Sequence, residues 1–252
     1  MKYSLKQVKN SYLEIDPIVS KLIFHPIGKY LVFLLANFTS ITPNQVTVFS
    51  FILRIGAAYA ILTQNFIISA VLAALSHLFD GIDGVLARVT EKKSKLGGLL
   101  DSLFDGIGYS LLILSLAVML LMKGRFDSAL IILVLFYLFF NEYNSNLLFN
   151  KNVNKEEVRE KSALHEWMEK LNNSALPVFF KRRISKIVAL TLKIKMNPIP
   201  SFIETYFLLF VVAPFFNYNN IILVVAILLY LPQFIFSLIK LFFIMKKLKS
   251  IG

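Results

Sequence analysis

Residues 77–110 read HLFDGIDGVLARVTEKKSKLGGLLDSLFDGIGYS, a stretch that places four acids within apolar sequence. Two apolar segments each carry a pair of acids, Asp80 with Asp83 and Asp101 with Asp105, and a short basic turn separates the segments. A charge inside a bilayer is costly, so acids within membrane segments indicate a functional site. The alternative is that these acids lie in solvated loops, and the apolar residues on both sides argue against it.

The spacing of the acids predicts that they converge. Asp80 and Asp83 are three residues apart and Asp101 and Asp105 four apart, so each pair shares one helix face. In an antiparallel hairpin the two pairs lie at the same depth, roughly 12–19 Å from the turn at about 1.5 Å per residue. Four carboxylates close together at low dielectric cannot all stay ionised unless a cation offsets their charge. Oxygen-only ligands favour Mg²⁺ or Mn²⁺.

The composition excludes a soluble domain. Of the 252 residues, 57% are hydrophobic and 17% charged, and the mean hydropathy is +0.68. Soluble domains have about 45–50% apolar and about 25% charged residues. The chain has no Cys, which excludes disulfides, thiol catalysis and thiolate metal sites. These numbers predict an integral membrane protein.

We expect an all-α integral membrane fold with six transmembrane helices, because six apolar segments approach the roughly 20 residues that cross a bilayer. They cover about 43–63, 65–90, 95–122, 128–149, 199–216 and 220–245. Residues 17–39, interrupted by Lys21, Pro26 and Lys29, predict an amphipathic interfacial helix. The expected division is a cytosolic N-terminus with this helix at 1–42 and a six-span domain at 43–252, with a cytosolic loop at about 150–198.

The distribution of basic residues predicts the orientation. With the N-terminus inside, 24 of the 27 Lys and Arg residues fall on the cytosolic side. This bias predicts cytosolic termini and a site that opens to the cytosol. The N-terminal residues show no secretory signal. The net charge of +12 is attributed to orientation and anionic lipids rather than to nucleic acid.

Small residues and one arginine flank the acids. Gly84, Ala87 and Gly97 let helices or a ligand approach closely. Arg88 is placed to bind a phosphate group, or alternatively to reach the membrane interface. Together with the four acids they form Asp80-x2-Asp83-Gly84-x2-Ala87-Arg88-x8-Gly97-x3-Asp101-x3-Asp105. This 26-residue pattern resembles the signature of the CDP-alcohol phosphotransferases.

The resemblance implies transfer of a substituted phosphate from a CDP-alcohol, such as CDP-diacylglycerol, to the hydroxyl of an alcohol acceptor, with release of CMP. It implies two Mg²⁺ or Mn²⁺ ions, one held by Asp80, Asp83 and Asp101. Asp80 and Asp101 would bridge to the second ion, and Asp105 would bind that ion and accept the proton. The residues implied to bind the CDP-alcohol are Pro43, Asn44, Gln45, Val46, Gly84, Arg88, Ser94 and Gly97.

The candidates for the acceptor site lie outside this motif. The polar end of the fourth span, with Glu142 and Asn144, is a candidate, and a polar seam between helices is the alternative. Arg182 and Arg183 would bind a phosphorylated acceptor or anionic headgroups. Arg54 and Glu204, both within spans, are expected to pair with opposite charges. His77 is expected to have a structural or supporting role.

Two other functions remain open at this point. A prenyltransferase also binds diphosphate through Mg²⁺ and Asp-rich helices, but leaves the Gly-x2-Ala-Arg and Gly-x3-Asp spacing unexplained. An ion-coupled transporter would use the carboxylates as a cation site and predicts inverted repeats and broken helices, which the sequence does not show. The expected partners are a CDP-linked donor, an alcohol acceptor and membrane lipids, with a second copy of the chain as a further candidate.

Overall fold

The computed structural model describes residues 2–13, 16–152 and 201–249, and within these ranges the fold is helical without a strand. A short helix α1 (Leu5–Asn10) precedes a π-helical turn (Ser20–Phe24) that continues into α2 (His25–Phe38). The long helices are α3 (Pro43–Leu62), α4 (Phe66–Val89), α5 (Lys95–Met122) and α6 (Phe126–Asn152). After the undescribed stretch come α9 (Phe202–Tyr206), a π-helical turn (Phe207–Val212), a 3₁₀ turn (Ala213–Phe216) and α10 (Asn220–Lys249).

Three of these helices, α3, α4 and α5, are long and apolar enough to cross a membrane. They contain 20, 24 and 28 residues, and a helix needs about 20 to span the hydrocarbon core. Shorter apolar helical stretches occur at Phe126–Phe140, Phe202–Phe216 and Asn220–Pro232. The described part of the chain is therefore helical, with three helices suited to a membrane, which agrees with the membrane class predicted from composition.

Local signals in the sequence account for the helix ends. The Thr42 side chain accepts a hydrogen bond from the Gln45 backbone, and Gln45 bonds back to Thr42, so a capping box opens α3 at Pro43. The Ser94 side chain caps α5 by accepting from the Gly97 backbone N–H. Residues with a positive φ angle occupy the tight turns, among them Gly124 with φ +68°. The first three predicted spans agree with the observed helices within one residue at each end.

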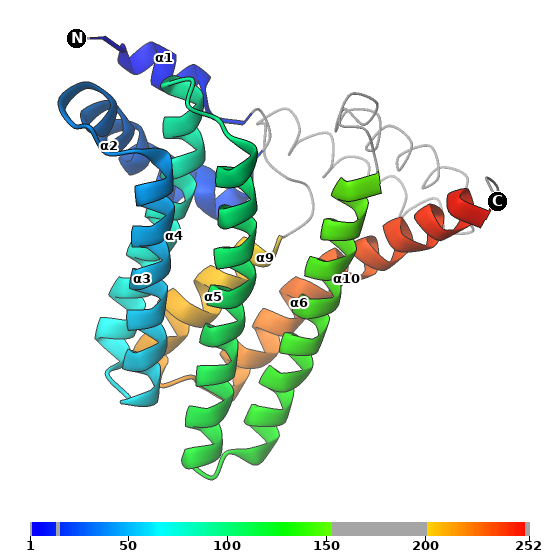
Figure 1. Ribbon diagram of the computed structural model, residues 1–252. Coiled ribbons are helices and arrows are strands. Elements are labelled where there is room, and N and C mark those ends of the chain that lie inside the picture. Colours follow the sequence, from blue (N-terminus) through cyan, green and yellow to red (C-terminus); the bar gives the residue numbers. More distant parts are fainter. Residues whose placement is uncertain (1, 14–15, 153–200, 250–252) are drawn as a thin grey trace, which may run out of the picture.

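Helix α3 packs against both α4 and α5, which follow one another in the chain. In Figure 1, α3, α4 and α5 lie side by side, α6 lies along α5, and α10 crosses α6. One buried cluster joins α5, α6, α9 and α10 and includes Leu112, Leu116 and Tyr206. A second cluster includes Val8, Val32 and Ile82 and joins α1 and α2 to α4. The N-terminal helices thus pack against the helix that carries the first pair of acids.

The fifth apolar segment differs from its prediction as a single helix at 199–216. The chain there passes from α9 through a π-helical turn into a 3₁₀ turn that contains Pro214. Proline has no backbone N–H and disrupts a regular helix interior, which accounts for the change of helix type. The predicted polar loop at about 150–198 lies outside the described residues, except for its first three positions, which belong to α6.

Candidate active site

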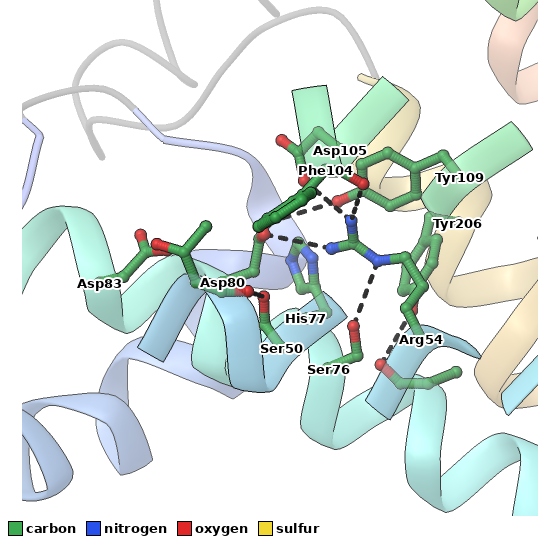
Figure 2. A network of polar contacts seen from close by, with 12 residues as sticks. Ser50, Arg54, Ser76, His77, Asp80, Asp83, Phe104, Asp105, Tyr109 and Tyr206 are labelled. Atoms are coloured by element: carbon green, nitrogen blue, oxygen red, sulfur yellow. Dashed lines mark hydrogen bonds and ion pairs between the residues drawn. The ribbon is translucent and has the colours of Figure 1, made fainter. Parts of the chain in front are cut away.

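The hairpin of α4 and α5 brings three of the four predicted acids together. Asp80, Asp101 and Asp105 each offer a carboxylate oxygen, and these oxygens lie within 4.8 Å of one another. The fourth acid, Asp83, is buried and lies outside this group, as Figure 2 shows. Its Oδ2 accepts a hydrogen bond of 2.5 Å from the hydroxyl of Thr47 on α3. The carboxylates are thus divided between a group of three and one acid that is tied to the neighbouring helix.

A buried arginine from α3 contacts two of the grouped acids. The Nη1 of Arg54 lies 2.9 Å from Asp105 Oδ1, and its Nη2 lies 3.1 Å from Asp80 Oδ1. The guanidinium also packs over the Tyr109 ring at 4.0 Å from the ring centroid. Figure 2 shows the Arg54 head group between Asp80 and Asp105. The prediction that Arg54 pairs with an opposite charge is confirmed.

A cavity of about 220 Å³ opens beside the acids. Asp80, Asp83 and Asp101 line one side of it. The other side comes from the N-terminal segment, which sequence analysis did not connect with the site. The residues of that side include Tyr12, Asp16, Ser20, His25 and Gly28. Val8 is the one buried residue of α1. An apolar residue at this position in an otherwise polar segment is the sequence feature that indicates packing of α1 against the other helices.

Arg88 lies where the two sides of the cavity meet. Its Nε donates a 2.5 Å hydrogen bond to the backbone carbonyl of Ser11, and Arg88 also lines the cavity together with Gly84. The predicted phosphate-binding arginine is thus oriented by the N-terminal segment. Its remaining guanidinium N–H groups are the donors that suit a bidentate phosphate contact.

His25 lies in the N-terminal wall with its Nε2 3.4 Å from Asp16 Oδ2. Burial, with the nearby charges of Lys21 and Arg88, lowers the pKa of His25 to about 4, so its imidazole is neutral at pH 7. The His25 ring packs on Tyr12 with 4.2 Å between centroids. Burial raises the pKa of Tyr12 to about 12. The Tyr12 hydroxyl is buried without a hydrogen-bond partner within the described part of the chain, and it lies 2.9 Å from the position that a Cβ at Gly28 would take.

Three of the residues implied to bind the nucleotide lie in contact at the start of α5. A Cβ added at Gly97 would lie 2.7 Å from Asn44 Oδ1 and 2.9 Å from Ser94 Oγ. Asn44 is exposed there, whereas Pro43 and Val46 are buried and Gln45 is part of the capping box of α3. Within residues 43–46, Asn44 therefore lies next to Gly97. The other three residues form the first turn of α3 and so fix the position of Asn44.

The candidate acceptor residues lie at the end of α6 and beyond it. Glu142 and Asn144 lie within α6, whose backbone alone is described at these positions, and Arg182 and Arg183 lie outside the described residues. Glu204 accepts hydrogen bonds from the backbone N–H of Ser201 at 2.6 Å and of Val19 at 3.4 Å. The bond to Ser201 is part of the capping box of α9, and the bond from Val19 links α9 to the N-terminal segment.

Several contact residues of the site are absent from the sequence-based prediction. Thr47 contacts Asp83, Ser76 accepts a 3.2 Å hydrogen bond from Arg54 Nε, and the Tyr109 hydroxyl lies 3.5 Å from Asp80 Oδ2. Ser76 and Tyr109 each lie four residues from a predicted ligand, Asp80 or Asp105, and therefore share its helix face. His77 is buried against Phe24 with Ser20 Oγ 3.4 Å from its Nε2, consistent with a structural role.

The donor set fits a hard divalent cation. The three grouped acids offer oxygen atoms only, they are half-buried, and they lie close enough to share an ion. Mg²⁺ and Mn²⁺ prefer such carboxylate ligands. Asp80, Asp101 and Asp105 are the residues that would hold the ion, with Asp83 one helical turn from Asp80.

Comparison with known proteins defines the class. The CDP-alcohol phosphatidyltransferase family matches residues 40–245, and the chain belongs to this family. It is 39% identical over 77 residues to an archaetidylinositol phosphate synthase of Pyrococcus horikoshii, covering 31% of this chain and 41% of the relative. It is 36% identical over 89 residues to a phosphatidylinositol phosphate synthase of Corynebacterium glutamicum, covering 35% of this chain and 38% of the relative.

A third relative, a bifunctional IPC transferase and DIPP synthase of Thermococcus kodakarensis, is 46% identical over 65 residues, which cover 26% of this chain and 15% of the relative. The matched stretches thus span less than half the length of these curated relatives. Family membership favours the CDP-alcohol transferase prediction over the prenyltransferase and transporter alternatives.

Proposed function

We propose that this protein transfers a substituted phosphate group from a CDP-linked lipid to the hydroxyl of an alcohol acceptor and releases CMP. The observation that carries the proposal is the convergence of Asp80, Asp101 and Asp105 on two adjacent helices, beside a cavity that Gly84 and Arg88 line. These are the residues of the family pattern. A set of carboxylates next to a phosphate-binding arginine suits phosphoryl transfer, which depends on positioning and electrostatic stabilisation.

In the proposed reaction the acceptor hydroxyl attacks the phosphorus atom that carries the lipid alcohol. The new oxygen–phosphorus bond forms as the bond to the CMP phosphate oxygen breaks, and CMP leaves with that electron pair. Asp105 accepts the hydroxyl proton, because a carboxylate held within the group is a suitable general base. Divalent cations held by the acids would neutralise charge on the diphosphate and on the departing oxygen. Arg88 and Asn44 bind the CDP portion, with Gly97 and Ser94 shaping the contact.

We propose an inositol phosphate as the acceptor and a lipid-linked CDP as the donor. The support is the printed names of two relatives, which make archaetidylinositol phosphate and phosphatidylinositol phosphate. Glu142, Asn144, Arg182 and Arg183 remain candidates for the acceptor site. The polar residues would bind hydroxyl groups and the two arginines would bind the phosphate.

We further propose six spans, with α6, the segment 202–216 and α10 completing the bundle. Both termini and the site would then face the cytosol, with residues 17–39 at the interface and 1–42 outside the membrane core. The basic residues that flank the spans support this arrangement. Membrane lipids are the expected surroundings, and a second copy of the chain is a candidate partner.

The proposal is tested by CMP release from purified protein. CDP-diacylglycerol and CDP-archaeol serve as donors, and inositol, inositol phosphate and glycerol phosphate as acceptors, each with MgCl₂ or excess EDTA. We expect CMP release that requires the divalent cation and an acceptor, with the highest rate for inositol phosphate. CMP release that persists undiminished in EDTA would refute the metal-dependent mechanism, and a preference for another acceptor would refute the acceptor assignment alone.

A further inference from the structure

Arg54 is fully buried at the centre of the aspartate group, and the proposed reaction gives it no role. An arginine stays charged in proteins, and a buried charge needs well-placed partners. The partners here are two catalytic-site carboxylates, Asp80 at 3.1 Å and Asp105 at 2.9 Å. The same positive charge therefore contacts a proposed metal ligand and the proposed general base.

The surroundings of Arg54 specify one orientation of its guanidinium. The Nε donates to Ser76 Oγ at 3.2 Å, and the Nη1 lies 3.4 Å from the Phe104 carbonyl in addition to its contact with Asp105. The Tyr109 ring covers one face at 4.0 Å. Helices α4 and α5 therefore both contact the head group, which α3 supplies (Figure 2).

A glycine on α5 makes room for the arginine. A Cβ at Gly108 would lie 2.4 Å from Arg54 Cδ and 3.1 Å from its Nη1. A distance below 3.0 Å to an atom in the middle of a packed side chain requires the arginine to move. Gly108 and Arg54 therefore form a matched pair across the α3–α5 contact, and the position of the charge depends on both.

We propose that Arg54 is a positioning residue, a built-in counter-cation that holds Asp80 and Asp105 in place before divalent cations bind and limits the affinity of the group for those cations. This rests on the proposed function, because it assigns these acids to a metal. The four acids of the pattern carry four negative charges when ionised, and Arg54 neutralises one of them. Without Arg54 the metal-free group has greater like-charge repulsion, and an added divalent cation relieves more of it.

The test measures melting temperature and metal binding of the purified full-length protein in detergent, in EDTA and in saturating MgCl₂. Arg54→Gln removes the charge. Arg54→Lys keeps a charge but cannot bridge two carboxylates in the same way. Gly108→Ala keeps Arg54 but displaces its stem. Gly98→Ala is the matched control, because it adds the same methyl group to the same helix with nothing within 4 Å.

We expect Arg54→Gln to lower the melting temperature in EDTA by at least about 5 °C, since it leaves buried carboxylates without their partner. In MgCl₂ the loss shrinks to less than half, and the Mg²⁺ dissociation constant from calorimetry falls at least tenfold. Gly108→Ala shifts both quantities in the same direction, Arg54→Lys lies between Arg54→Gln and the wild type, and Gly98→Ala matches the wild type.

An equal loss of melting temperature in EDTA and MgCl₂ would show a packing role only and overturn the proposal, as would an unchanged melting temperature in both. If Arg54→Gln does not fold, Gly108→Ala and Arg54→Lys are judged by the same comparison. A wild-type protein without any Mg²⁺-induced shift would refute the metal assignment of the proposed function. The melting temperature of Arg54→Gln in EDTA would then still decide whether Arg54 pairs with the acids.

Discussion

Replacing Gly97 with alanine tests the contact between α3 and the start of α5. The added Cβ would lie 2.7 Å from Asn44 Oδ1 and 2.9 Å from Ser94 Oγ, so both side chains must move. Ser94 Oγ is also the acceptor for the Gly97 backbone N–H at 2.9 Å. One methyl group therefore disturbs a helix cap and a proposed nucleotide contact together.

The magnitude follows from the interactions that are lost. Losing the Ser94 cap costs about 1 kcal/mol, and overpacking costs about 1–3 kcal/mol. Alanine recovers about 0.5–1 kcal/mol of helix stability relative to glycine. The net loss is about 1–3 kcal/mol, which lowers the melting temperature by roughly 3–10 °C for a chain of this size. Displacing Asn44 and Ser94 should weaken donor binding about tenfold, about 1.4 kcal/mol.

The assay is a thermal melt in detergent beside calorimetric titration with the CDP-linked donor. Gly98→Ala is the matched control, because its added methyl group meets nothing within 4 Å. It should keep both values at the wild-type level or gain slightly in stability. If Gly97→Ala melts and binds donor like Gly98→Ala, the contact of Gly97 with Asn44 and Ser94 does not shape the nucleotide site and the reasoning is refuted.

Three further predictions concern single side chains. Asp105→Asn should reduce CMP release by about 10²–10⁴-fold, as expected for loss of a general base. Donor binding measured by calorimetry should stay within about tenfold of the wild type. If Asp105→Asn loses donor binding as completely as Asp80→Asn does, Asp105 is a metal ligand and not the base. Thr47→Val leaves the buried Asp83 oxygen without its 2.5 Å donor, so unfolding free energy should fall by about 1–3 kcal/mol, and a melting temperature equal to the wild type would contradict this. Burial lowers the pKa of His25 from 6.5 to about 4 in the folded protein. Between these two pH values the unfolded state binds more protons than the folded state, so the free energy of unfolding falls as the pH drops from 6.5 toward 4. His25→Phe should remove that part of the acid sensitivity in thermal melts at pH 7 and pH 5, and an unchanged pH dependence would argue against it.

The helical membrane class and the ends of the first three long helices could be predicted from the sequence, as could the approach of Asp80, Asp101 and Asp105, whereas Asp83, expected in the same group, lies outside it. These features depend on local rules: apolar length, caps and turns, and the equal depth of residues on the two sides of a short hairpin. Pro214 is the residue in the sequence that indicates a break in the fifth apolar helix. The π-helical and 3₁₀ turns at this break pack against α4, a contact that the sequence alone does not specify.

The side chains from other elements that contact the acids of α4 and α5 follow from the tertiary packing and could not be predicted from the sequence. Arg54 lies 26 residues from Asp80 and 51 from Asp105, and the spacing alone does not specify how α3 is rotated against α4 and α5. The same holds for Thr47 at Asp83 and for Ser11 and Tyr12, which reach Arg88 and the cavity from the N-terminal segment. These contacts depend on helix packing. The missing side chain at Gly108 and the sizes of the buried apolar side chains determine how far apart the helices lie and how they are rotated.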